Sequence, residues 1–195
     1  LFGEALVLET NYGIERSGES FRTSATVRLL GGFGVGVGYI RTTAIGTGDT
    51  TVLVPHPIFL NRPRAATKAV TALGHRESMV HLHGAWIVQL NERVHIQFFG
   101  GPSLMHLEQA IVTNAVLGAE VFPYEVVELL GVSGMEVEES GVGFNGGADF
   151  AFMIAPYWGI GGFVQYAGGK LDLQMLEEPT SITLGGFQFG AGIRL

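Results

Sequence analysis

The chain has 195 residues, and although 47% of them are hydrophobic, only 15% are charged. Soluble domains carry about 25% charged residues on average, so this chain has few charges with which to cover a soluble globule. The net charge of −7 argues against a nucleic-acid partner, because no basic stripe is available to neutralise phosphates. The chain contains no cysteine, which excludes disulfides and thiolate chemistry.

The glycine content favours strands over helices. The chain holds 30 glycines, against a usual share of about 7%, and glycine is unfavourable in helix interiors. A membrane-spanning helix needs roughly 20 consecutive apolar residues, and here the apolar runs are interrupted by Arg, Gln, His, Asn or clustered Gly. If such a chain lies in a membrane, a closed β-barrel is the remaining way to pair every backbone group. Because the sequence starts at Leu1 and not at Met, we interpret it as a mature or trimmed chain whose export signal has been removed.

Residues 1–13 predict a first strand, and residues 21–39 predict a hairpin. Successive side chains of a strand point to opposite faces, so one face of a membrane strand is apolar and the other is polar. Along the first arm of the hairpin, every second residue from Phe21 is apolar or small, and Arg22 and Arg28 fall on the other face. Along the second arm, bulky residues alternate with glycines, and a Leu-Gly-Gly turn joins the two arms.

The same alternation continues to the end of the chain. Residues 75–112 predict a second hairpin, in which apolar residues alternate with Glu, His, Arg and Gln around a turn at residues 91–92. Residues 141–173 predict a third hairpin, with its turn at residues 155–157. Residues 181–195 predict the last strand, where Phe, Ala, Ile and Leu alternate with Gln, Gly and Arg.

These elements predict an all-β fold, an eight-stranded antiparallel up-and-down transmembrane β-barrel that forms one domain over residues 1–195. Tight turns on one side alternate with longer connections on the other, which is the pattern of outer-membrane barrels. The long connections are expected at residues 14–20, 44–74, 113–140 and 174–180. An even number of strands places both termini on the short-turn, periplasmic side, and the longer loops are then extracellular.

The closing segment, Leu184-Gly-Gly-Phe-Gln-Phe-Gly-Ala-Gly-Ile-Arg-Leu195, resembles the final strand of porin-superfamily proteins. The pattern of the whole chain is similar to the eight-stranded outer-membrane protein A-like and X-like barrels. This resemblance implies an integral protein of the outer membrane of a Gram-negative bacterium, a monomer inserted by the assembly machinery, with membrane lipids and lipopolysaccharide as partners. It implies no single activity, because similar barrels include anchors, adhesins and lipid-modifying enzymes. Such barrels usually end in an aromatic residue, whereas this chain stops at Leu195.

A barrel of eight strands is just wide enough for its interior to be filled by side chains. Here the inward parity carries most of the charged residues of the strands, and buried charges are costly unless they are paired. We therefore expect a structural network in the lumen. Its expected members are Arg22, Arg28 and Arg194, with Glu77, Asp149, and Glu4 or Glu9 as partners.

Three histidines form a candidate metal site. His81 and His83 share one face of a strand, and His95 lies on the neighbouring strand, although no cysteine or carboxylate completes the set. A lipid hydrolase would instead need a serine, a histidine base and an orienting acid on the outer wall. The histidines lie on the inward parity, and the sequence has no His-x-Ser pair. We therefore expect no catalytic residues and no cofactor.

Aromatic residues predict two girdles at the membrane–water interfaces, because Trp and Tyr rings are apolar while their polar atoms favour water. The expected members are Tyr39, Trp86, Tyr157, Trp158 and Tyr166.

Two loop segments stand out. A proline-rich segment at residues 54–64 carries His56, Arg62 and Arg64, and this basic loop is expected to contact lipopolysaccharide phosphates or to fold over the barrel mouth. The predicted loop at residues 113–140 is acidic, with several glutamates and no Lys or Arg.

The sequence favours a non-enzymatic outer-membrane barrel with a structural or loop-mediated interaction role. Two other functions stay open at this point. A soluble lipocalin-like barrel would bind an apolar ligand, and it would be apolar inside and polar outside. A barrel-embedded enzyme acting on lipid would carry a His–Ser–acid cluster on its outer wall.

Overall fold

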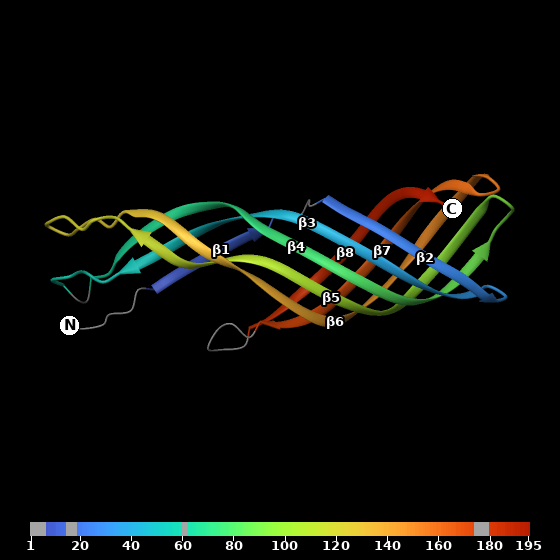
Figure 1. Cartoon of the computed structure of the whole chain (residues 1–195), viewed down its shortest axis with the longest axis horizontal. Helices are drawn as coiled ribbons and strands as arrows, with labels where there is room; N and C mark the ends of the chain where they lie inside the picture. Colours follow the sequence, from blue (N-terminus) through green and yellow to red (C-terminus); the bar gives the residue numbers. More distant parts are fainter. Residues whose placement is uncertain (1–6, 15–18, 60–61, 174–179) are drawn as a thin grey trace. The chain divides into compact units, whose positions relative to one another are not determined.

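The computed structural model describes residues 7–14, 19–59, 62–173 and 180–195. Within these ranges there are eight strands, labelled in Figure 1, and no helix. This part of the chain accordingly has no helix that is long and apolar enough to cross a membrane. The strands are β1 Val7–Ile14, β2 Glu19–Leu30, β3 Phe33–Val54, β4 Arg64–Gln89, β5 Val94–Leu117, β6 Leu129–Ala155, β7 Trp158–Leu173 and β8 Thr180–Arg194.

The strands form one sheet in the order β1-β3-β4-β5-β6-β7-β8, and β2 also pairs with β3. β1 runs antiparallel to the later part of β3, from Val7 opposite Leu53 to Ile14 opposite Gly46. β2 meets the beginning of β3 through the tight turn after Leu30. β1 and β2 therefore share one partner strand. The predicted all-β class and its eight antiparallel strands are confirmed.

The strands extend far into segments that the sequence predicted to be loops. β3 continues to Val54 and β4 begins at Arg64, so the predicted loop at residues 44–74 is wrong, and only residues 55–63 connect the two strands. Likewise, only residues 118–128 connect β5 and β6. The physical reason is that these extensions carry Thr, Gly and charged residues on the exposed face, so the apolar alternation stops before the strand does. The predicted connection at 174–180 lies, apart from Thr180, outside the described residues.

The first strand starts opposite the end of β3, and the last strand ends opposite the start of β7. Val7 pairs with Leu53 near the end of β3, far along that strand from its tight turn. Arg194 pairs with Gly159, directly after the tight turn that precedes β7. The prediction that both termini lie on the short-turn side is therefore wrong for the start of β1. The reason is that β1 and β2 both pair antiparallel with β3, so these two strands run in the same direction.

The chain divides into two compact units, each with its own apolar core. Unit 1 comprises residues 1–19, 43–76 and 108–138, and unit 2 comprises residues 20–42, 77–107 and 139–195. The buried core residues of unit 1 are Val52, Val54, Val127 and Leu129. Those of unit 2 are Met79, Met105, Leu107, Ala167, Leu171 and Leu184.

The three tight turns of unit 2 belong to neighbouring hairpins. Ile87 N donates to Gly32 O at 2.7 Å, and Met153 N donates to Arg93 O at 2.7 Å, so each turn region is bonded to the next. Asn91 Oδ1 accepts hydrogen bonds from the backbone N–H groups of residues 93 and 94, at 2.9 and 2.8 Å. These bonds hold the turns together at one end of unit 2.

Gly31, in the turn between β2 and β3, has a φ of +59°. We expect Gly31→Ala to lower the free energy of unfolding by about 1–2 kcal/mol, because a Cβ strains the left-handed conformation. A Cβ at this position meets no atom within 4 Å, so the loss would come from the backbone alone. Gly74 also has open space but no positive φ, and Gly74→Ala is the matched control. Urea unfolding followed by tryptophan fluorescence gives the comparison, and equal effects would contradict the strain argument.

Candidate functional site

Unit 2 has an apolar outer face. On β3, Phe33 is 67% exposed and Val35 is 52% exposed, and on β8 Phe189 is 85% exposed. The same parity on the other strands carries further exposed bulky residues. These include Phe21, Val27, Leu29, Val37, Leu82, Trp86, Phe98, Leu104, Val142, Phe144, Phe150, Phe152, Ile160, Val164, Phe187 and Ile193. Soluble monomers rarely expose so large a continuous apolar surface.

The exposed face of β3 changes character along the strand. Its odd-numbered residues are bulky and apolar in unit 2, from Phe33 to Tyr39. From Arg41 onward the exposed residues of the same parity are mainly polar, and they include Thr43, Thr47 and Asp49. The apolar outer face therefore ends close to the boundary of unit 2.

The opposite parity of unit 2 is buried, and beside the apolar core it carries several polar side chains. His81 is 2% exposed, Ser103 is 1% exposed and Gln165 is 1% exposed. Their outward neighbours in the sequence, such as Leu82 and Val164, are more than half exposed. Unit 2 thus buries a set of polar side chains beside its apolar core, while its outer face is bulky and apolar.

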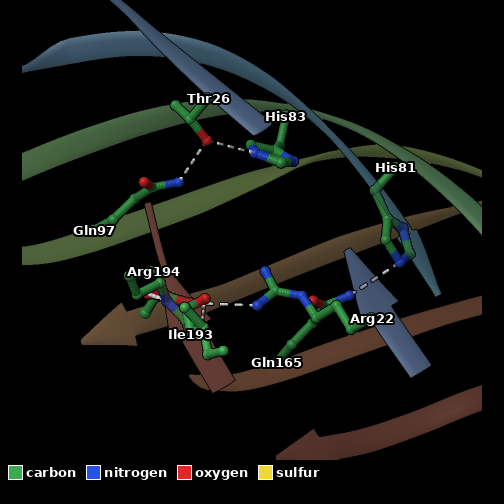
Figure 2. Close-up of polar contacts among 9 residues, drawn as sticks. Arg22, Thr26, His81, His83, Gln97, Gln165, Ile193 and Arg194 are labelled. Carbon is green, nitrogen blue, oxygen red and sulfur yellow. Dashed lines mark hydrogen bonds and ion pairs between the residues drawn. The ribbon is translucent and has the colours of Figure 1, made fainter. Parts of the chain in front are cut away.

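An ionic cluster fills part of the interior of unit 2 (Figure 2). Asp149 on β6 accepts from Arg194 on β8, with Nε to Oδ1 at 2.8 Å and Nη2 to Oδ2 at 2.7 Å. Arg22 on β2 also reaches Asp149 Oδ2, from Nη1 at 3.3 Å. The Arg22 guanidinium lies 4.2 Å from the ring centre of Phe163 and 5.2 Å from that of Phe99. Strands that are far apart in the sheet order therefore meet through their inward side chains, which requires the sheet of unit 2 to curl.

A second cluster contains only neutral polar groups. Gln165 Nε2 lies 3.0 Å from His81 Nε2, and His81 Nδ1 lies 2.8 Å from Ser103 Oγ. Because the amide nitrogen is a donor, His81 Nε2 accepts and the imidazole proton lies on Nδ1, which donates to Ser103. Asn145 Nδ2 donates to the same hydroxyl at 3.0 Å. The buried polar groups thus bind one another and hold β4, β5, β6 and β7 in register.

A smaller group bridges β2, β4 and β5. Figure 2 shows Thr26 between Gln97 and His83. Gln97 Nε2 donates to Thr26 Oγ1 at 3.0 Å, and His83 Nε2 lies 3.4 Å from the same oxygen. Gly36 leaves room for this arrangement, because a Cβ there would fall on the His83 ring nitrogen and lie 2.7 Å from Thr26 Oγ1.

The structure places only part of the predicted lumen network together. Arg22, Asp149 and Arg194 meet as one cluster. Arg28 is exposed and forms no hydrogen bond or ion pair with the described residues, so its place in the network was wrongly predicted. Glu77 is half-buried in unit 2, whereas Glu9 is exposed on β1 in unit 1 and Glu4 lies outside the described residues. The alternation of side chains along the strand predicted that Arg28 points inward. Arg28 lies close to the turn after Leu30, however, and its side chain is exposed.

The predicted metal site is not formed. Groups of three or more His, Cys, Asp or Glu that are able to hold a metal are absent from the described residues. His81 uses both ring nitrogens for Ser103 and Gln165, and His83 faces Thr26. His95 is half-buried on β5 and does not complete a set with them.

The five predicted girdle aromatics all lie in unit 2. Tyr157 is 83% exposed and Trp158 is 47% exposed at the turn before β7, and Trp86 is 54% exposed near the end of β4. Tyr166 is 37% exposed and packs 5.1 Å from Phe187, measured between ring centres. Tyr39 is half-buried on β3.

The predicted interacting residues of the basic loop belong to unit 1. His56 is 3% exposed and Arg64 is 8% exposed, so both side chains are buried. Arg64 donates to Tyr124 O at 2.8 Å and to Pro55 O at 2.7 Å, and it forms an ion pair with Glu120. Arg62 is exposed. Arg64 thus contacts the loop at residues 118–128, whose proximity to this segment the sequence did not indicate.

The sequence also did not reveal two serine–histidine pairs that form across strands. His81 binds Ser103 in the interior, and His106 Nδ1 lies 2.9 Å from Ser140 Oγ on the outer face. In both pairs the two residues lie on different strands, so a His-x-Ser pattern within one strand does not indicate them. Predicting these pairs requires the register between the strands.

Comparison with protein-family models, with curated proteins and with solved structures finds no match to this chain. The assignment of a function therefore depends on the geometry alone.

Asp149 is the single carboxylate that binds both Arg22 and Arg194. We expect Asp149→Asn to lower the free energy of unfolding by about 2–3 kcal/mol, because it leaves two partly buried guanidinium groups without a counter-charge. Asp49→Asn, at an exposed position on β3, is the matched control and should change stability little. Urea unfolding of the two variants gives the measurement. A small loss at both positions would show that the cluster is solvated.

Proposed function

We propose that this protein is an integral β-barrel protein of the bacterial outer membrane, with a structural or loop-mediated interaction role and no catalysis. Unit 2 is the part assigned to lipid. The observation that carries the proposal is the polarity of its two faces, with bulky apolar side chains exposed and polar side chains buried. In lipid such an outer face is stabilised, whereas in water it costs free energy.

The length of the apolar stretches supports this proposal. A tilted membrane β-strand needs about 9–11 residues to cross the hydrocarbon core. The strand β2 has 12 residues, and the apolar alternation of β3 ends at about Arg41. The aromatic residues Tyr157, Trp158 and Trp86 lie beside the tight turns, where a membrane–water interface favours them.

The interior argues against a soluble ligand-binding barrel. Ionic, amide and imidazole groups from β2 to β8 bind one another there, and Met79, Met105 and Leu107 pack beside them. A carrier of apolar ligands would have the reverse distribution, with an apolar cavity and a polar surface.

Heat-modifiability tests the proposal. We expect the protein to fractionate with outer membranes and to migrate differently on a detergent gel before and after boiling, because a paired barrel resists detergent until heated. A water-soluble monomer without a migration shift would overturn the membrane assignment.

Charged substitutions refine the same test. Ile160 in unit 2 is 55% exposed and Ile45 in unit 1 is 61% exposed, so on a soluble protein arginine would be tolerated equally at both positions. In lipid, Ile160→Arg should cost about 1–3 kcal/mol, between the values for the midplane and the interface, because Ile160 lies two residues inward from Trp158, and Ile45→Arg should cost less. Folding yield into vesicles and urea unfolding measure the difference. Equal stability of the two variants would contradict a lipid-facing unit 2.

One observation favours a second candidate, a barrel-embedded enzyme that acts on lipid. The His106–Ser140 pair lies on the outer face of unit 2, near the exposed Leu104 and Val142. A hydroxyl bonded to an imidazole is the first part of a serine hydrolase, which also needs an orienting acid and oxyanion donors.

We expect Ser140 to be inert toward a fluorophosphonate probe on the folded protein in lipid vesicles, because the non-catalytic role is the one we propose. The buried Ser103 beside His81 is the internal control. Mass spectrometry of the labelled protein locates any adduct. Labelling at Ser140 that is lost in both Ser140→Ala and His106→Gln would contradict the proposed non-catalytic role and would indicate an enzyme.

A further inference from the structure

β2 and β8 are the edge strands of the sheet in unit 2. Among the described residues, β2 is hydrogen-bonded only to β3, and β8 only to β7. The far side of each strand therefore presents backbone N–H and C=O groups that no strand of this part of the chain pairs. Such edges readily bind a further strand in water, and in lipid every backbone group needs a partner.

The two edge strands run toward the same end of unit 2. β2 ends at the tight turn after Leu30, and Arg194, at the end of β8, pairs with Gly159 directly after the tight turn that precedes β7. The tight turns are bonded to one another at this end of the unit. A single added strand that starts at this end and runs away from it would be antiparallel to both edges. Antiparallel pairing is the more stable kind and is the kind that this sheet already uses.

The inward residues of the edge strands are more open than those in the middle of the sheet. Ser24 on β2 and Gly192 on β8 are exposed, although both belong to the inward parity. His81 and His83 on β4, which has a neighbour on each side, are buried. The interior of unit 2 is therefore open along its two edges.

The charge beside these edges is not fully balanced. Arg22 on β2 and Arg194 on β8 share the carboxylate of Asp149, and their side chains keep 11% and 22% of their surface exposed. Two guanidinium groups and one carboxylate leave a net charge of +1. Among the described residues, Arg22 uses one of its five N–H groups in a hydrogen bond. A second carboxylate would balance this charge and accept from the remaining donors.

We propose that β2 and β8 together bind one strand of another protein chain, antiparallel to both, with an inward Asp or Glu beside Arg22. The outward residues of this strand are apolar and extend the surface that carries Phe21 and Phe189. β8 pairs with β7 without interruption from Phe187 to Arg194, so a segment of about eight residues matches this edge. The inference rests on the proposed interaction role of the barrel and names the chemistry of its partner.

The first test asks whether β2 and β8 are neighbours when no partner is added. The chain has no cysteine, so introduced pairs report on this directly. Adjacent strands lie about 4.8 Å apart, within reach of a disulfide, whereas strands separated by a third lie about 9.6 Å apart, beyond its reach. In phosphatidylcholine vesicles we expect no disulfide between Ala25→Cys and any of Phe187→Cys, Phe189→Cys or Ala191→Cys. The opposed pair Val164→Cys and Phe189→Cys is the positive control.

A disulfide between β2 and β8 would show direct closure and would overturn this proposal, even if the protein fractionates with membranes and is heat-modifiable. Loss of the membrane assignment is thereby distinguished from loss of the partner strand. A disulfide-linked dimer of the single variant Ile193→Cys would mean that a second copy of the chain occupies the edge, and it would also overturn the proposal.

The second test adds a synthetic ten-residue peptide in which valine alternates with threonine. The peptide has a cysteine at its N-terminus and one glutamate in place of a central threonine. An antiparallel strand places this cysteine at the tight-turn end, so we expect cross-links to Leu29→Cys on β2 and to Ile193→Cys on β8. Cross-linking to Phe21→Cys instead would indicate the opposite direction and would overturn the proposal.

The inward carboxylate is tested by a matched peptide with glutamine in place of glutamate. From cross-link yield against concentration, we expect the glutamate peptide to bind about tenfold more tightly, because it gains a charge-assisted hydrogen bond. This preference should be lost in Arg22→Gln and kept in Arg93→Gln, which removes an exposed arginine elsewhere in unit 2. If Arg22→Gln does not fold, the two peptides still give the test on the unaltered arginines. Equal affinity for both peptides, or no binding of either, would overturn the proposal.

Discussion

The interior of unit 2 depends on one carboxylate. Asp149 receives Arg194 through two hydrogen bonds and Arg22 through a third, and these residues come from β6, β8 and β2. Guanidinium groups taken out of water need a counter-charge and filled hydrogen-bond positions, and Asp149 supplies both. These partners lie on strands that are far apart in the sheet order. The ion pairs that neutralise the two arginines can therefore form only because the sheet of unit 2 curls.

The remaining interior follows from this constraint. Once the inward parity is polar, every donor and acceptor there needs a partner, and the bonds among His81, Ser103, Gln165 and Asn145 provide several of them. The outward parity is left to the bulky apolar side chains. Strand alternation thus separates the two kinds of residue, and the described part of the chain holds no helix that could cover the apolar face.

The sequence was sufficient where one face of a strand is apolar and the other is polar, as at residues 21–39. It was insufficient where both faces carry Thr, Gly or charged residues, as in the second half of β3, because such a segment has no period of two in its hydrophobicity. Partners across strands were also beyond reach. Parity placed Asp149 and Arg28 on the same inward face, but only the fold decides that Asp149 is paired and that Arg28 is in solvent. The partners of Arg64 likewise lie on a loop about 60 residues further along the chain.

The sharing of β3 by β1 and β2 has a consequence for the edges of the sheet. Each step in the order from β2 to β8 reverses the direction of the chain, and β2 and β8 are separated by six such steps. These two strands therefore run in the same direction. Direct hydrogen bonding between them would be a parallel ladder, with evenly spaced and slanted bonds, within a protein whose other strand pairs are antiparallel. Such a seam would be the least regular line of backbone bonding in unit 2, and the side chains of Arg22 and Arg194 already bind one carboxylate beside it.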